Sequence, residues 1–122
     1  MEIARQHETT MINELSGAEC TRVLGVGPAH ELGPLFCYIQ AGGEWYRFFI
    51  HHGILFWVTT EPDPEDDLAE GEEYADILKD ANVNKSLIES VEMDDGCLTI
   101  TLATGRCLKF REVSERGGMS VT

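Results

Sequence analysis

The sequence predicts an α+β fold that is mostly antiparallel β-sheet, with one or two helices. The main observation is a pattern that occurs twice. Residues 36–48 and 98–110 each contain an apolar, β-prone run, a turn of small residues, and a second run that ends in a basic and an aromatic residue. Such a pattern is typical of a β-hairpin. A second observation is the segment 66–81, whose apolar residues have helical spacing. Two similar hairpin or meander halves fit either an open α+β domain or a partly open barrel.

The length of 122 residues and a hydrophobic content of 43% predict a single domain that spans residues 1–122. A chain of this size buries about two-thirds of its unfolded surface, so it needs no disulfides or metals to fold. Both ends are polar, and we therefore expect residues 1–8 and 114–122 to be flexible.

A short helix and a strand are expected before the first hairpin. The hydroxyl of Thr9 or Thr10 suits the start of this helix, and Gly17 suits its end just after Leu15. The strand is expected at about 20–26, before a loop that is rich in glycine and proline.

The first hairpin is expected to be apolar on both faces. With a three-residue loop, Tyr46 lies opposite Tyr38. In the same register Phe48 lies opposite Phe36. A ribbon of this kind should be central in the fold or covered on both sides. The second face then carries Leu35, Ile39, Trp45 and Phe49.

The strongest change in composition is at 61–76, where nine of sixteen residues are acidic. Two prolines predict a loop over 61–65. Asp66 or Asp67 is then expected to cap a helix that ends near Ala81, with the carboxylates favourably placed at its N-terminus.

The second hairpin, residues 97–113, should have one apolar and one polar face. A three-residue loop closed by a left-handed glycine places Leu98 opposite Phe110 and, further along, Ile100 opposite Leu108. The polar face then carries Thr99, Thr101, Cys107, Lys109 and Arg111. The other expected elements are a turn at 51–53, a strand at 54–59, a strand at 87–93 and a turn at 94–96.

The four cysteines are expected to be reduced thiols. In the predicted register Cys107 lies opposite Thr101, which leaves Cys97 roughly 13 Å away along the strand, too far for a disulfide. Closely spaced Cys or His pairs of the zinc-binding kind are absent from the sequence. The N-terminal residues also lack the pattern of a secretory signal. Together these features predict a cytoplasmic protein.

Motifs that carry catalysis are absent from the sequence. It has no G-x-S-x-G nucleophile turn and no phosphate loop with Lys-Ser or Lys-Thr. The adjacent His51 and His52 belong to a predicted turn, and further ligands are not spaced to join them. The acidic run does not follow the ligand order of a calcium-binding EF-hand. We therefore expect a protein that is not an enzyme and that holds no cofactor and no metal.

The charge of the chain indicates the kind of partner. Nine Lys and Arg against 22 Asp and Glu give a net charge of −13, which repels nucleic acid and anionic membranes and attracts a basic protein. The alternative is a solvated surface that only keeps the chain soluble. The oligomeric state is left open. The candidate partner-binding residues are Trp57, Glu61, Asp63, Glu65, Asp66, Asp67, Glu70, Glu72, Glu73, Tyr74 and Asp76.

A resemblance lies in residues 84–113. Their strand, turn and hairpin carry Gly96, Leu98, Ile100, Gly105, Leu108 and Phe110 at matching positions. In this the segment resembles small acidic bacterial immunity proteins and related families. The resemblance implies a protein that binds and blocks a toxin, such as a nuclease with a basic active site. The other function class that we consider is a small enzyme or ligand-binding β-barrel, with a pocket lined by Tyr38, Trp45, Tyr46 and Trp57.

Overall fold

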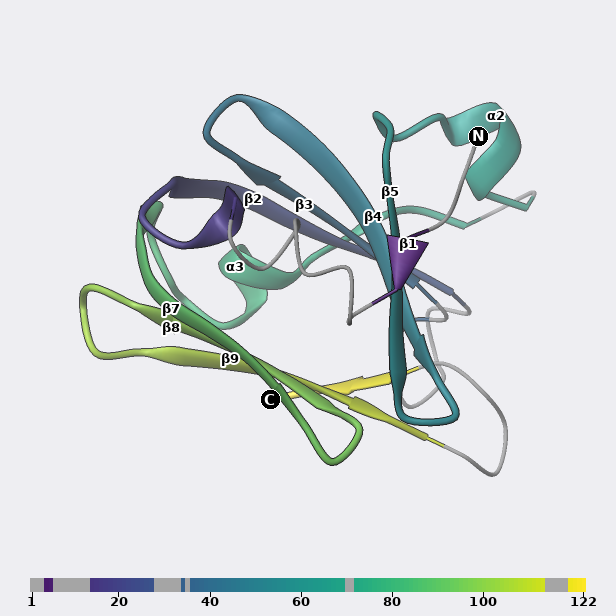
Figure 1. Cartoon of the computed structure of the whole chain (residues 1–122). Coiled ribbons are helices and arrows are strands. Elements are labelled where there is room, and N and C mark those ends of the chain that lie inside the picture. The colour runs from purple at the N-terminus through teal and green to yellow at the C-terminus, as the bar shows by residue number, and fades with distance from the viewer. Residues whose placement is uncertain (1–3, 6–13, 28–33, 35, 70–71, 114–118) are drawn as a thin grey trace.

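A computed structural model describes residues 4–5, 14–27, 34, 36–69, 72–113 and 119–122. In this part of the chain most residues lie in antiparallel strands, and two short helices follow the first meander (Figure 1). The strands are β1 (Ala4–Arg5), β2 (Glu19–Val26), β3 (Phe36–Ala41), β4 (Glu44–His51), β5 (Ile54–Thr59), β6 (Ala75–Asp76), β7 (Ser86–Asp94), β8 (Cys97–Leu102), β9 (Cys107–Glu112) and β10 (Met119–Val121). The helices are α2 (Pro64–Asp67) and α3 (Ile77–Asp80). This confirms a mostly antiparallel fold with few helices.

The strands follow the order β1-β5-β4-β3-β2-β7-β8-β9-β10, and β6 pairs with β2 beside this path. Strand β2 changes partner along its length. Its first residues, Glu19 and Cys20, pair with β7, whereas Leu24 and Gly25 pair with β6. The sheet divides at this point into two layers, β1 to β6 and β7 to β10, which Figure 1 shows crossing one above the other. Among the described strands the path does not close into a barrel.

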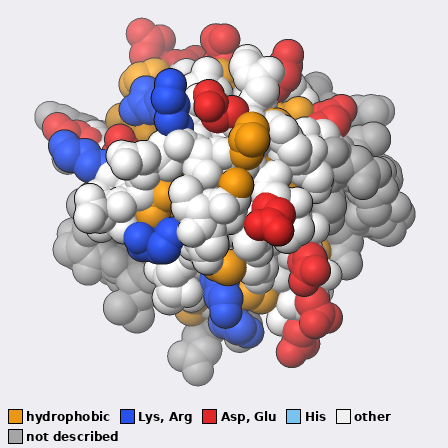
Figure 2. Space-filling model, turned by 90° about the vertical axis from the view of Figure 1, so that its left-hand side faces the viewer, with side chains coloured by type: hydrophobic (Ala, Val, Ile, Leu, Met, Phe, Trp, Pro, Cys, Tyr) orange, Lys and Arg blue, Asp and Glu red, His pale blue; other side chains and the backbone are white. Residues whose placement is uncertain are grey.

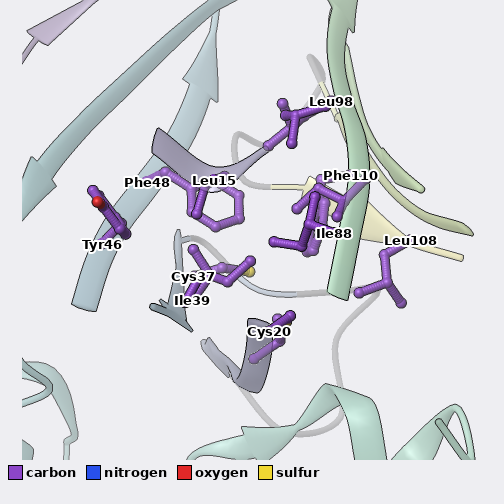
Figure 3. Packing of buried hydrophobic residues seen from close by; sticks show 14 of the residues in the cluster. Leu15, Cys20, Cys37, Ile39, Tyr46, Phe48, Ile88, Leu98, Leu108 and Phe110 are labelled. Carbon is purple, nitrogen blue, oxygen red and sulfur yellow. The ribbon is translucent and has the colours of Figure 1, made fainter. Parts of the chain in front are cut away.

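The main core fills the space between the two layers. Phe48 of β4 and Phe110 of β9 are fully buried, and their rings meet edge to face with centroids 5.1 Å apart. Figure 3 shows Phe48 and Ile39 directed from one layer toward Phe110 and Ile88 of the other. Burial of large apolar side chains of this kind supplies most of the favourable free energy of folding.

The second hairpin has the predicted register and faces. Leu98 pairs with Phe110, Ile100 pairs with Leu108, and all four side chains are at most 2% exposed. The loop ends at Gly105, whose φ of +92° lies in the left-handed region that glycine adopts without strain. The opposite face carries the partly or fully exposed side chains Thr99, Thr101, Cys107, Lys109 and Arg111.

The first hairpin has a different register from the predicted one. Gly42 and Gly43 both have positive φ, +59° and +84°, which makes a two-residue turn of the type that matches strand twist. The turn is one residue shorter than expected, so Tyr46 lies opposite Ile39 rather than Tyr38. Phe48 likewise lies opposite Cys37. A shift of one residue moves side chains to the other face, and the predicted face assignment was therefore wrong.

The predicted helix from Asp66 or Asp67 to Ala81 was also wrong. Helix α2 begins at Pro64 and ends at Asp67, and the chain is then extended at Leu68. The loop expected over 61–65 is replaced in part by this helix, because proline fits the first helical position, where a missing N–H costs nothing. The helical stretch near Ala81 is the separate α3. Neither helix is long or apolar enough to cross a membrane, and the same holds for the rest of the described chain.

The ends of the chain are partly described. Residues 114–118 and most of 1–8 lie outside the described part, but Met119–Val121 pairs with β9 as strand β10, and Met119 is fully buried. A flexible tail was expected over 114–122, and no strand was predicted at its end. Helical residues are present at Glu14 and Leu15, before Gly17 with its positive φ. The remainder of the predicted first helix lies outside the described residues.

Candidate functional site

Residues 61–76, which we call the acidic segment and which are described except for 70 and 71, pack against the outer face of the first hairpin. On this face Tyr38 is 1% exposed, although it points away from the main core. It belongs to a second apolar cluster that also includes Leu24 and Val26. Leu68 and Tyr74, from the acidic segment, pack against this cluster together with Phe36 and Trp45. The expectation that the hairpin is covered on both faces is thereby confirmed.

The carboxylate of Asp67 fastens the segment to the sheet. Its Oδ1 accepts a hydrogen bond of 2.9 Å from the hydroxyl of Tyr38, and its Oδ2 accepts one of 2.7 Å from the hydroxyl of Tyr74. The backbone N–H of Asp63 donates a third bond of 2.9 Å to Oδ2. Burial, together with the hydrogen bond to Asp67, raises the pKa of Tyr38 to about 12 and raises that of Tyr74 as well.

Three further carboxylates of the segment stabilise its backbone. Asp63 caps helix α2 by accepting from the N–H of Glu65 at 3.1 Å. Glu72 accepts from Ala69 N–H at 2.7 Å. Asp76 caps α3 in the same way, through a 3.1 Å bond from Lys79 N–H. These side chains, like Asp67, therefore stabilise the local structure of the segment through hydrogen bonds.

Four other acidic side chains of the segment are exposed: Glu61, Glu65, Asp66 and Glu73. We call these four the acidic surface. Glu70 lies outside the described residues. Beside them the surface has a hollow of about 450 Å³ between β4 and the segment. Its lining consists of Tyr38, Arg47, Thr60, Glu61, Pro62, Asp63, Asp66 and Asp67.

Trp57, an expected aromatic anchor, lies elsewhere. It is 8% exposed, belongs to the main core, and its ring centroid is 6.0 Å from that of Tyr46. Tyr74, the other expected anchor, belongs to the opposite face of the sheet. The expectation that both aromatics flank the acidic run was therefore wrong for Trp57. The error follows from the absence of any signal for which face of β5 is buried, since Ile54–Val58 is apolar throughout.

The aromatic pocket that we considered for an enzyme or a ligand-binding barrel is not formed. Tyr38 and Trp45 share the outer face of the sheet, with ring centroids 6.3 Å apart. Tyr46 and Trp57 lie on the inner face, in the main core. The four side chains are thus divided between two sides of one sheet.

Other reactive side chains do not gather into a site within the described residues. No group of three or more His, Cys, Asp and Glu side chains in that part of the chain is arranged to hold a metal. All four cysteines are free thiols, and burial raises the pKa of Cys20 to about 12 and that of Cys37 as well. Buried thiols that stay protonated are poor nucleophiles.

The predicted turn between β4 and β5 is formed by His52 and Gly53, and His51 is the last residue of β4. His52 has a positive φ of +51°, and the backbone N–H groups of His52 and Gly53 donate to the carboxylate of Glu112 at 2.7 and 2.9 Å. The Gly53 amide, with that of His52, lowers the pKa of Glu112. This contact joins the two layers, and nothing in the local sequence indicates it, because the partners are about sixty residues apart.

Charge is distributed differently on the side away from α2. Figure 2 shows the left-hand side of Figure 1, where acidic and basic side chains alternate with uncharged surface and only small hydrophobic patches appear. The described basic side chains of β9, Lys109 and Arg111, are exposed. Exposed carboxylates also occur outside 61–76, at Glu89, Glu92, Asp94 and Asp95.

Comparisons of the chain with protein-family models, with curated proteins and with solved structures find no significant match. The resemblance to immunity proteins in residues 84–113 thus stays a prediction.

Proposed function

We propose that the protein is an acidic binding module whose acidic surface recognises a basic protein, and that it inhibits such a partner as an immunity protein inhibits a basic toxin. The observation that carries this proposal is that the carboxylates of one segment have two different roles. Asp67 is fastened by two tyrosine hydroxyls, while Glu61, Glu65, Asp66 and Glu73 remain exposed around it. The exposed carboxylates are therefore held by a structured support rather than by a loose tail.

A fixed array of like charges has a physical consequence. The carboxylates repel one another, and a partner's lysines and arginines relieve that repulsion when they bind. Complementary fields also steer the encounter and raise the association rate. Because the segment is already packed on the sheet, little conformational entropy is lost when a partner docks on it. A toxin that binds the phosphates of nucleic acid presents a basic surface of this kind.

The competing explanation is that the acidic surface only keeps the protein soluble. The two explanations differ in one respect that can be measured. If the acidic surface only keeps the protein soluble, removing its charges should affect partner binding no more than removing the same number of exposed charges elsewhere. If it is a binding surface, removing its charges should weaken binding more. Strand β7 and its turn supply a matched set, since Glu89, Glu92, Asp94 and Asp95 are also exposed.

The test compares two variants of equal charge. The first replaces the acidic surface by amides (Glu61→Gln, Glu65→Gln, Asp66→Asn, Glu73→Gln). The second replaces the β7 set (Glu89→Gln, Glu92→Gln, Asp94→Asn, Asp95→Asn). The partner is a basic protein encoded beside this gene or captured at low salt with the wild-type protein, and purified before use. Its dissociation constant is then measured with each variant.

We expect the acidic-surface variant to bind at least tenfold more weakly than wild type, because several charge pairs are lost together. The β7 variant should bind within about threefold of wild type. Equal losses in both variants would mean that only net charge matters. A loss confined to the β7 variant would place the interface on the outer face of the second hairpin, near Thr99 and Arg111. Either outcome would overturn the proposal.

A further inference from the structure

An aromatic side chain lies on the same face of the sheet as the hollow beside the acidic surface, and it contacts one of the residues that line the hollow. Trp45 lies two residues before Arg47 on β4, so both are on the outer face of the sheet. The Trp45 ring meets that of Tyr38 edge to face, and Tyr38 lines the hollow. Trp45 itself is only partly buried. Trp45, unlike Trp57, thus lies on the face of the sheet that carries the acidic segment.

The residues that line the hollow carry a net negative charge. Glu61, Asp63 and Asp66 contribute carboxylates to its wall, and Asp67 contributes a fourth. The one cation among its lining residues is Arg47, whose guanidinium lies 5.4 Å above the ring of Phe36. The net charge of the hollow is therefore negative, and its volume of about 450 Å³ is enough for a long side chain to enter.

We infer that this hollow is the docking point for a lysine or arginine side chain of the basic partner, and that Trp45 packs against that side chain. The inference rests on the proposed function and specifies where the partner is held. Carboxylates at the rim complement the cation, and an aromatic face attracts it further. Arg47 is a like charge already inside the hollow, so it opposes the incoming cation and limits its affinity.

The first test uses the two tryptophans as separate reporters. A Trp57→Phe variant retains only Trp45, and a Trp45→Phe variant retains only Trp57. A short oligoarginine peptide is added to each at low salt, and peptide binding is followed independently by the anisotropy of a dye on the peptide. We expect tryptophan emission to change in step with binding in the Trp57→Phe variant and to stay constant in the Trp45→Phe variant. Circular dichroism checks that both variants are folded.

The second test uses the sign of the charge at Arg47. Replacing it by glutamine removes a cation from the hollow, and the peptide should bind about threefold more tightly at low salt. Arg111→Gln removes the same charge from an exposed position on β9 and should change the affinity less. Weaker binding by the Arg47→Gln variant, or an equal effect of the two substitutions, would overturn the inference.

The outcomes separate this inference from the proposed function. If the peptide binds and neutralising the acidic surface abolishes that binding, but Trp45 emission does not change, the acidic surface is the interface and the hollow is not its docking point. If the peptide does not bind the wild-type protein at low salt, both proposals fail.

Discussion

The hydroxyl of Tyr74 donates a hydrogen bond of 2.7 Å to Oδ2 of Asp67, seven residues before it in the chain. This bond closes the acidic segment into a loop that is anchored to Tyr38 on the sheet through the other oxygen of the same carboxylate. Asp67 thus holds the neighbouring acidic residues in place. Replacing Asp67 should therefore change the stability of the protein more than replacing an exposed neighbour.

Asp67→Asn should destabilise the protein, by about 1–3 kcal/mol, because the amide cannot accept both tyrosine hydroxyls as a carboxylate does. Asp66→Asn changes the same charge one residue away at an exposed position, and it should alter the free energy of unfolding by less than about 0.5 kcal/mol. Urea unfolding of both variants measures the difference. Equal values would show that Asp67 is only another surface carboxylate.

The raised pKa values of three tyrosines predict a loss of stability at alkaline pH. The pKa of Tyr38 is raised from 10.0 to about 12, and the pKa values of Tyr46 and Tyr74 are also raised. A group with a raised folded-state pKa contributes stability that is complete below its unfolded pKa and is lost as the pH rises through the folded value. The free energy of unfolding should therefore fall between about pH 10 and pH 12.

A Tyr74→Phe variant separates one tyrosine from the other two. It should be less stable than wild type at neutral pH and should lose less stability on going to pH 12, because one titrating group is absent. Chemical unfolding at several pH values gives both quantities. A wild-type protein whose stability does not change over this range would contradict the raised pKa values of these tyrosines.

The contact between the two layers can be tested at Phe110. Its ring packs edge to face on Phe48, and the side chain is fully buried. Truncation to alanine should lower the free energy of unfolding by about 3–5 kcal/mol. Leu87 is 53% exposed, and Leu87→Ala is the matched control with an expected loss below about 1 kcal/mol. A small loss for Phe110→Ala would mean that the layers do not share one core.

The two-residue turn of the first hairpin can be tested at Gly43, which has φ of +84° and where an added β-carbon would meet nothing within 4 Å. Gly43→Ala should therefore destabilise through backbone strain alone, by about 1 kcal/mol. Gly43→Asn should cost less, since asparagine tolerates the left-handed region. Thermal unfolding compares the two. Equal stability of wild type and Gly43→Ala would contradict the observed turn and its register.

The difference between the two hairpins explains which parts of the fold could be predicted from sequence. In the second hairpin, leucine and isoleucine alternate with threonine, and only one register buries the apolar set, so Leu98 and Phe110 were paired correctly. In the first hairpin both faces are apolar. Shifting the register by one residue therefore still places an apolar face toward the core. For this reason the alternation of apolar and polar residues does not determine the register of this hairpin.

The acidic segment shows a second reason. Its apolar residues have helical spacing, but Leu68 and Tyr74 are used to cover the outer face of β2 and β3 rather than to form one face of a helix. Tertiary packing overrides local helical preference here. The concentration of acidic residues is evident from the sequence, whereas the anchoring role of Asp67 was not predicted, because its partner Tyr38 is twenty-nine residues away.

The most direct test of partner binding by the acidic surface is the salt dependence of the association rate constant. Stopped-flow mixing of the purified basic partner with wild type, the acidic-surface variant and the β7 variant gives this rate at several ionic strengths. Steering by exposed charges is screened beyond about 8 Å at physiological salt. We expect the rate for wild type and the β7 variant to fall steeply as salt rises, and the rate for the acidic-surface variant to start lower and to change much less. The same steep fall in all three proteins would contradict a role for Glu61, Glu65, Asp66 and Glu73 in recognition.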